Sequence, residues 1–141
     1  MSLTALIPYF ESRCDAAGLT KFNDAFGTEI PSTILDNSYH IRLGDVTTRE
    51  PLNQHVIVMS SPITILIWLK GYRDTASARD GAIALSRDLI KDCLLAVNRF
   101  SVDIKNIEFN NMIVEPLGAD NDNIVQVSLG FNCVTVLGID L

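Results

Sequence analysis

Residues 118–123, GADNDN, place two aspartates and two asparagines within one short stretch. Carboxylate and amide oxygens are the ligands that calcium prefers, and Asp120 and Asp122 have the spacing of the first two ligands of an EF-hand loop. The later positions do not fit, because Val125 stands where that loop needs glycine and Phe131 where it needs a bidentate glutamate. We therefore expect no metal site here, and we interpret the stretch as a hairpin turn whose polar side chains bond local backbone.

Histidines are the next candidates for acid–base chemistry, and the chain has two. His40 alternates with apolar neighbours and is expected to point away from the core, while His55 ends a polar loop. Neither forms a recognised motif with a cysteine, serine or carboxylate, and HExxH, GxSxG, GxGxxG and Walker patterns do not occur. We expect no enzyme activity, no catalytic residue and no cofactor, and we expect both histidines at the surface or in an interface.

The three cysteines, Cys14, Cys93 and Cys133, are odd in number and widely spaced. They fit neither a disulfide framework nor a pair of metal ligands. All three fall at apolar-face positions, so we expect them to be small buried hydrophobic residues.

Acidic residues of the segment 74–92 are interleaved with basic ones around a predicted helix. This mixture is typical of a solvated face, and in an assembly it could serve as a surface of inter-subunit ion pairs. The residues are Asp74, Arg79, Asp80, Arg87, Asp88, Lys91 and Asp92.

Length and charge bound the class of protein. With 141 residues, 48% of them hydrophobic, the chain is long enough for one domain, residues 1–141, with a real core. Its 17 acidic and 11 basic residues give a net charge of -6. That sign argues against a nucleic-acid binder, because such proteins gain affinity from Lys and Arg contacts to phosphates.

The sequence shows no recognisable signal peptide and no apolar stretch long enough to span a membrane. The first residues lack a basic segment and reach Glu11 before any adequate apolar stretch, so we expect no signal peptide. The longest strongly apolar stretch, residues 63–69, is far shorter than the ~20 residues that a spanning helix needs. We expect a protein made in a cytoplasm, without contact with a membrane.

Hydrophobic periodicity predicts the elements that must position these residues. We expect a first helix that ends near Gly18 and that begins or bends at Pro8, and a long helix over 75–99. Strands are expected over 39–43, 56–59, 63–70, 102–115 and 125–135. A bulge or bend is expected at Ser60, Ser61 and Pro62 and another irregularity at Asn110 and Asn111.

This order of elements favours an α+β fold. We expect a mainly antiparallel sheet of about four strands with two helices packed on one face, in the order α-β-β-α-β-β. A parallel α/β sheet fits less well, because strands and helices do not alternate regularly.

Three segments in this order resemble the tail terminator proteins of long-tailed bacteriophages, small α+β proteins that stop growth of the tail tube. They follow the N-terminal helix and read IPSTILDNSYHIRLGD, ITILIWLKGYRDTASARDGAIALSRDLIKDCLL and FNNMIVEPLGADNDNIVQVSLGFNCVTV. The resemblance covers most of the chain and lies in the pattern of strand, helix and turn rather than in signature residues.

The resemblance implies a homo-oligomeric ring, a hexamer in the family, seated on the last ring of the major tail tube protein and offering a surface to a head-completion protein. DNA would pass through the lumen without specific binding, and an acidic wall would let it slide by repelling phosphates. The family implies no catalytic residues.

A ring closed by rotation needs two different complementary surfaces on each subunit. The candidate contacts are polar segments that project from the sheet, residues 44–55 and 115–123, with an apolar centre on the strand over 63–70. The candidate interface residues are Arg42, Arg49, Glu50, Leu66, Trp68, Glu115, Asp120 and Asp122. For Trp68, ordinary core packing is an equally good interpretation.

Two other functions remain open from the sequence. One is a different neck component, such as a head-completion or stopper protein. The other is a small-molecule enzyme or binding domain on an α+β scaffold, which the poor inventory of histidines and motifs disfavours.

Overall fold

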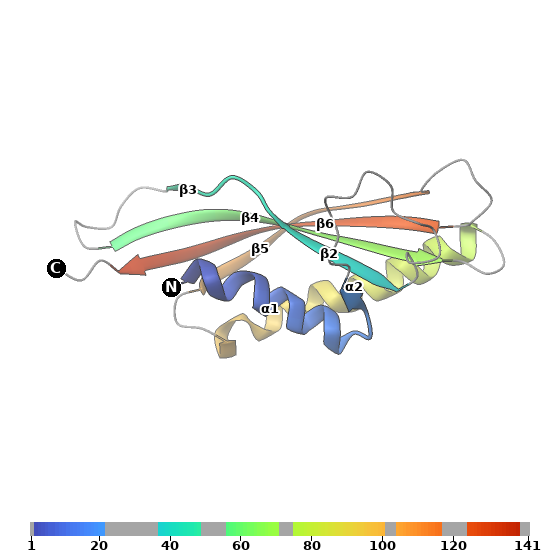
Figure 1. Cartoon of the computed structure of the whole chain (residues 1–141), viewed down its shortest axis with the longest axis horizontal. Helices are drawn as coiled ribbons and strands as arrows, with labels where there is room; N and C mark the ends of the chain where they lie inside the picture. The colour runs from blue at the N-terminus through green and yellow to red at the C-terminus, as the bar shows by residue number, and fades with distance from the viewer. Residues whose placement is uncertain are drawn as a thin grey trace.

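Two helices and six strands make up the part of the chain that the structure, a computed structural model, describes. That part comprises residues 2–21, 37–48, 56–70, 75–100, 104–116 and 124–138. In chain order the elements are α1 (Ser2–Ala16), β1 (Thr20–Lys21), β2 (Ser38–Leu43), β3 (Thr47–Thr48), β4 (Val56–Lys70), α2 (Thr75–Phe100), β5 (Ile104–Pro116) and β6 (Ile124–Gly138). Both helices lie on the same face of the sheet (Figure 1).

The strands form one sheet in the order β1-β2-β4-β6-β5, and β3 also pairs with β4. Every pair is antiparallel except β1 with β2. The fold is α+β, but the predicted sheet of about four strands in the order α-β-β-α-β-β is wrong, because the described order is α-β-β-β-β-α-β-β with six strands. β1 and β3 have two residues each, too few to show an alternating pattern in the sequence.

The central pair of the sheet is β4 and β6. They pair in one continuous register from Val56 opposite Gly138 to Lys70 opposite Ile124. Alternate side chains of both strands are buried in the core, where an aliphatic side chain contributes about 1.5–3 kcal/mol. These residues are Ile63, Ile65, Ile67, Val125, Val127, Leu129, Phe131 and Cys133. The alternation predicted over 125–135 is therefore confirmed, with one face buried against the helices.

β4 runs through Ser60, Ser61 and Pro62 without interruption, so the predicted break into two strands is wrong. The Pro62 carbonyl accepts a hydrogen bond of 2.8 Å from the Gly44 N–H, so the backbone groups of Pro62 point away from β6. The missing N–H therefore falls at the gap between β2 and β3. Pairing shifts by one residue across that gap, which places the irregularity in the outer strand rather than in β4.

Helix α1 ends as the glycine at position 18 predicts. Gly18 has a φ of 86°, and the Leu19 N–H donates to the Cys14 carbonyl while the Gly18 N–H donates to the Asp15 carbonyl. These two bonds make a Schellman motif, which satisfies carbonyls that the helix leaves without partners. At the other end α1 begins at Ser2 and includes Pro8, so of the two predicted alternatives, a start or a bend at Pro8, the start is wrong.

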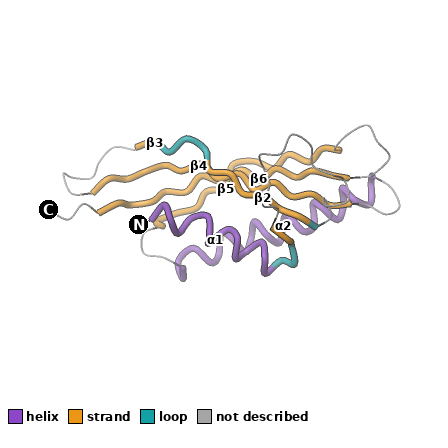
Figure 2. The backbone as a smooth tube through the Cα atoms, in the orientation of Figure 1, coloured by secondary structure: helices purple, strands orange, loops and turns teal. Residues whose placement is uncertain are grey.

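Side chains of α1 join it to the sheet and to α2. The ring centroids of Phe10 and Phe131 lie 5.3 Å apart, which joins α1 to β6. The Tyr9 hydroxyl donates a hydrogen bond to the Cys93 carbonyl on α2. Arg13 forms an ion pair with Asp92, with 3.6 Å between the guanidinium nitrogen and the carboxylate oxygen. Helix α2 spans the predicted range, and the two helices together cover one side of the core (Figure 2).

Strand β5 is irregular at two places. Its register against β6 shifts between Ile104 and Asn106 and again between Phe109 and Asn111, which confirms the irregularity predicted from the paired asparagines. Asn111 stands opposite Gly130, and a Cβ at Gly130 would clash with the Asn111 side chain. The glycine therefore leaves room for an asparagine that the bulge turns toward it.

Candidate functional site

The candidate site is the sheet face opposite α1 and α2, which we name the outer face. In antiparallel pairs, directly opposite residues share a face. One row across the sheet holds Trp68, Gln126 and Glu115, and another holds Arg42 and Thr64 on neighbouring strands. The register thus brings four predicted interface residues onto one surface: Arg42, Leu66, Trp68 and Glu115.

These four residues differ in exposure. Trp68 is 4% exposed and Leu66 is 8% exposed, whereas Arg42 and Glu115 are exposed. The Trp68 Nε1 donates a hydrogen bond of 2.9 Å to Oε1 of Gln126 across the strand pair. Trp68 and Leu66 therefore already pack within the single chain, and Arg42 and Glu115 are the two that a partner would reach directly.

The other four predicted interface residues, Arg49, Glu50, Asp120 and Asp122, lie outside the described residues. The same holds for His55 and for the turn over residues 118–123. His40 is half-buried and stands opposite Leu66 on the outer face, so the prediction that it points away from the helix-covered core is confirmed.

Three exposed apolar residues were missed by the sequence reasoning. Among the described residues, the large hydrophobic side chains with the greatest exposure are Leu43 at 43%, Phe109 at 37% and Ile113 at 48%. Leu43 lies on β2 and the other two on β5, which are strands on opposite sides of the β4 and β6 pair. Their exposure depends on the strand order, which places β5 at the end of the sheet and leaves the end of β2 without an outer strand.

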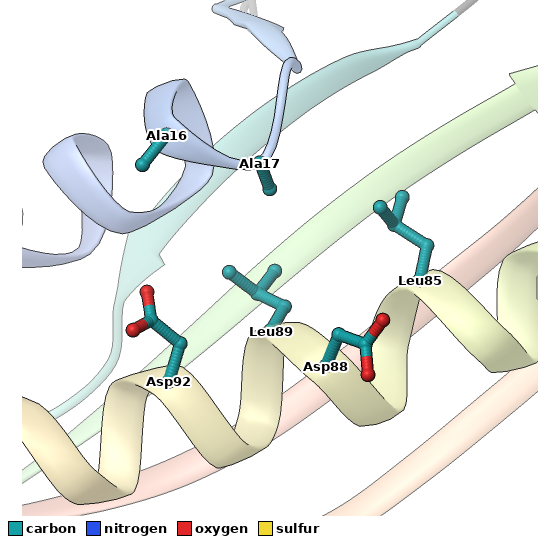
Figure 3. A pocket seen from close by; sticks show the side chains of 6 residues that line it. All are labelled: Ala16, Ala17, Leu85, Asp88, Leu89 and Asp92. Atoms are coloured by element: carbon teal, nitrogen blue, oxygen red, sulfur yellow. The ribbon is translucent and has the colours of Figure 1, made fainter.

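A hollow of about 270 Å³ lies between the end of α1 and the middle of α2 (Figure 3). Its floor is apolar, and the carboxylates of Asp88 and Asp92 stand on either side of Leu89. Asp92 already pairs with Arg13. The lining has no hydroxyl, thiol or imidazole side chain, and the described part of the chain contains no group of three His, Cys, Asp or Glu placed to hold a metal ion.

The cysteines are buried and free, as predicted. Desolvation raises the pKa of the Cys93 thiol to about 12, with the nearby Asp92 charge adding to it, and desolvation raises the pKa of Cys133 to about 12. Burial also raises the pKa of Cys14 well above its usual value. Because the thiolate is the reactive form, these thiols are inert packing groups at neutral pH.

The charged side of α2 is solvated, as predicted. Arg79, Asp80, Arg87, Asp88 and Lys91 are exposed, and Arg79 approaches Asp80 at 3.6 Å. Such exposed pairs contribute ~0–1 kcal/mol. Neither α1 nor α2 carries an apolar stretch that would reach across a bilayer.

The described residues thus place exposed charges on the outer face and exposed apolar side chains on strands at both sides of the β4 and β6 pair. No protein-family model matches the chain, and a search of curated proteins finds no significant match.

Proposed function

We propose that this chain is a structural virion protein that caps the tail tube of a long-tailed phage. It forms a hexameric ring on the last ring of the major tail tube protein, stops further polymerisation, and offers its free side to a head-completion protein. It acts at the head-proximal end of the tail after assembly in the host cytoplasm.

The observation that carries the proposal is the position of the exposed apolar side chains. Leu43 stands at one side of the sheet, and Phe109 and Ile113 stand at the other. A closed ring needs two different surfaces on each subunit, because a contact between identical surfaces would end at a dimer. Two apolar edges on opposite sides of one rigid sheet supply such a pair of surfaces.

The net charge of -6 also supports the proposal. A ring of six such chains carries a strongly negative field, and a negative lumen wall repels the phosphates of DNA. The genome would therefore pass through without specific binding. This charge has no comparable use in a protein that must hold nucleic acid.

Electron microscopy of negatively stained tail tubes tests this function. Tubes incubated with the purified protein should carry a ring at one end and should stop elongating when more tube protein is added. Tubes that keep growing, with no density at either end, would rule the function out.

A thermal-shift screen against metal ions and common metabolites addresses the enzyme alternative. A protein that acts only by contact should melt at the same temperature with and without each compound. A saturable rise in melting temperature with one metabolite would favour a small-molecule site instead.

A further inference from the structure

Two edges longer than two residues have no described strand beside them, and the two-residue strands β1 and β3 also lie at the margin of the sheet. One is the whole of β5, and the other is β2 from His40 to Leu43, beyond the part that pairs with β1. An open edge presents a row of N–H and C=O groups and is a ready template for another strand. The described structure therefore has two separate places where a sheet could be extended.

The direction of the strands allows these two edges to meet. Each strand of the series β2, β4, β6 and β5 runs antiparallel to its neighbour, so β2 and β5 run in opposite directions. If a second copy continues the sheet with the same face outward, its β5 lies antiparallel to β2 of the first copy. The same step repeated from copy to copy is a head-to-tail contact, which a ring requires.

The backbone groups of β2 that face outward can be identified. In an antiparallel strand, the N–H and C=O of one residue point to the same side, and the side alternates along the chain. The Gly44 N–H bonds to the Pro62 carbonyl, so even-numbered residues of β2 bond to β4. Ile41 and Leu43 therefore direct their backbone groups to the open edge.

The same alternation applies to β5. Pro62 directs its backbone groups to β2, so Ile63 and Phe131 bond to each other and Asn132 bonds toward β5. Glu108, which stands opposite Asn132, bonds to β6. Ile107 and Phe109 therefore direct their backbone groups to the open edge of β5.

Side-chain charge selects one register among those that this alternation permits. Arg42 is exposed on the outer face of β2, and Glu108 is exposed on the outer face of β5. Placing them opposite each other also pairs Ile41 with Phe109 and Leu43 with Ile107, all four on the helix-covered side. This register therefore joins opposite charges on one face and apolar side chains on the other.

The length of the match agrees with the irregularities on both strands. In this register the bulge at Asn110 follows Phe109, at the point where β1 begins to occupy the edge of β2. At the other end, β2 finishes at Leu43, which in this register stands opposite Ile107 and close to the register shift of β5 between Ile104 and Asn106. A bulge bends its strand, so β5 can leave the neighbouring copy at both ends of the contact.

We propose that β2 of one copy pairs antiparallel with β5 of the next copy, with Arg42 opposite the neighbour's Glu108, so that the sheet continues around the ring. The proposal deepens the ring proposed above and rests on it. The contact has four main-chain hydrogen bonds, two from each pair of outward-facing residues.

Disulfide trapping tests the register. Arg42 and Glu108 would form a pair without main-chain hydrogen bonds, whose Cα atoms lie ~4.5 Å apart in antiparallel sheets, within the range that a disulfide spans. We expect an equal mixture of Arg42→Cys and Glu108→Cys chains to give cross-linked dimers on mild oxidation. A chain carrying both substitutions should give cross-linked species up to the full ring.

The matched control replaces Glu115 instead of Glu108, because both are exposed carboxylates on the outer face of β5. Arg42→Cys mixed with Glu115→Cys should stay monomeric on a denaturing gel without reductant, as should each single variant and the unsubstituted chain. Efficient trapping through Glu115, or trapping of Glu108→Cys chains with themselves, would overturn the proposed pairing.

Charge reversal gives an independent readout. Arg42→Glu or Glu108→Arg alone should weaken association by about fivefold per contact, and the two together should restore it. Native mass measurement of the unsubstituted chain separates the two proposals. A ring that forms without trapping or charge rescue overturns only this pairing, and a chain that never associates overturns the ring as well.

Discussion

At the scale of single residues, Gly18 and Gly81 differ in whether the backbone conformation requires a glycine. Gly18 has a φ of 86° at the end of α1, a conformation that costs other residues about 1–2 kcal/mol, and a Cβ there would meet no atom within 4 Å. Gly81 lies exposed inside α2, where a Cβ would also meet no atom within 4 Å. Only the backbone conformation distinguishes the two sites.

We therefore expect Gly18→Ala to lower the free energy of unfolding by about 1 kcal/mol and Gly81→Ala to raise it by up to about 1 kcal/mol. Urea denaturation of both variants measures the difference. Gly18→Asn should lose less than Gly18→Ala, because asparagine tolerates the left-handed conformation. A shift of both alanine variants in the same direction would contradict the assignment of the Schellman motif.

The buried thiols predict a loss of stability in alkali. Burial raises the pKa of Cys93 and of Cys133 from an ordinary value near 9 to about 12. Below about pH 9 these thiols are protonated in both the folded and the unfolded chain, so their full contribution to the free energy of unfolding is present. As pH rises from about 9 to about 12, the unfolded chain releases these protons and the folded chain retains them, so stability falls by up to about 1.4 kcal/mol per pH unit and thiol.

Urea midpoints between pH 8 and pH 10.5 measure this effect. The midpoint should fall with rising pH, and it should fall less steeply in Cys133→Ala, which has lost one of the titrating groups. Equal slopes in the two proteins would show that Cys133 ionises as readily in the folded chain as in the unfolded one.

At the scale of elements, the sequence predicts well where a period is long and uninterrupted. The apolar stripe of α2 and the alternation over 125–135 both appear as predicted, because each element buries one face against the other layer. The asparagine pair at 110 and 111 marks the bulge of β5 correctly. These signals are local, so one sequence is enough to read them.

Strand pairing is not local, and here the prediction fails. Pro62 argues for a break in β4, yet its missing N–H falls at a gap in the neighbouring strand, which the sequence of β4 does not reveal. β1 and β3 exist only because β2 and β4 offer them backbone partners. The number and order of strands therefore follow from tertiary contacts that periodicity does not record.

Amide hydrogen exchange tests the edge assignment of β5. In the isolated chain the Phe109 N–H faces outward and should exchange fast, whereas the Glu108 N–H bonds to β6 and should be protected. On ring assembly the Phe109 amide should slow by at least about tenfold, while the Ile65 amide in the centre of the sheet should not change. A Phe109 amide that exchanges equally fast before and after assembly would place the subunit contact elsewhere.

At the scale of the whole molecule, the candidate site could be predicted only in part. Arg42 and Glu115 are exposed on the outer face, whereas Trp68 and Leu66 are buried within the chain, and the role of all four in a subunit contact stays a prediction. Leu43, Phe109 and Ile113 were missed because their exposure depends on which strands end the sheet. The proposed ring rests on the resemblance of the sequence pattern to tail terminator proteins and on these two edges together.

The measurement that tests the ring most directly is native mass spectrometry of the purified chain across a range of concentrations, with and without tail tubes. We predict one dominant assembly of six chain masses, because a head-to-tail contact that closes by rotation has a single preferred number of subunits. A chain that remains monomeric at every concentration and does not bind tube ends would contradict the account.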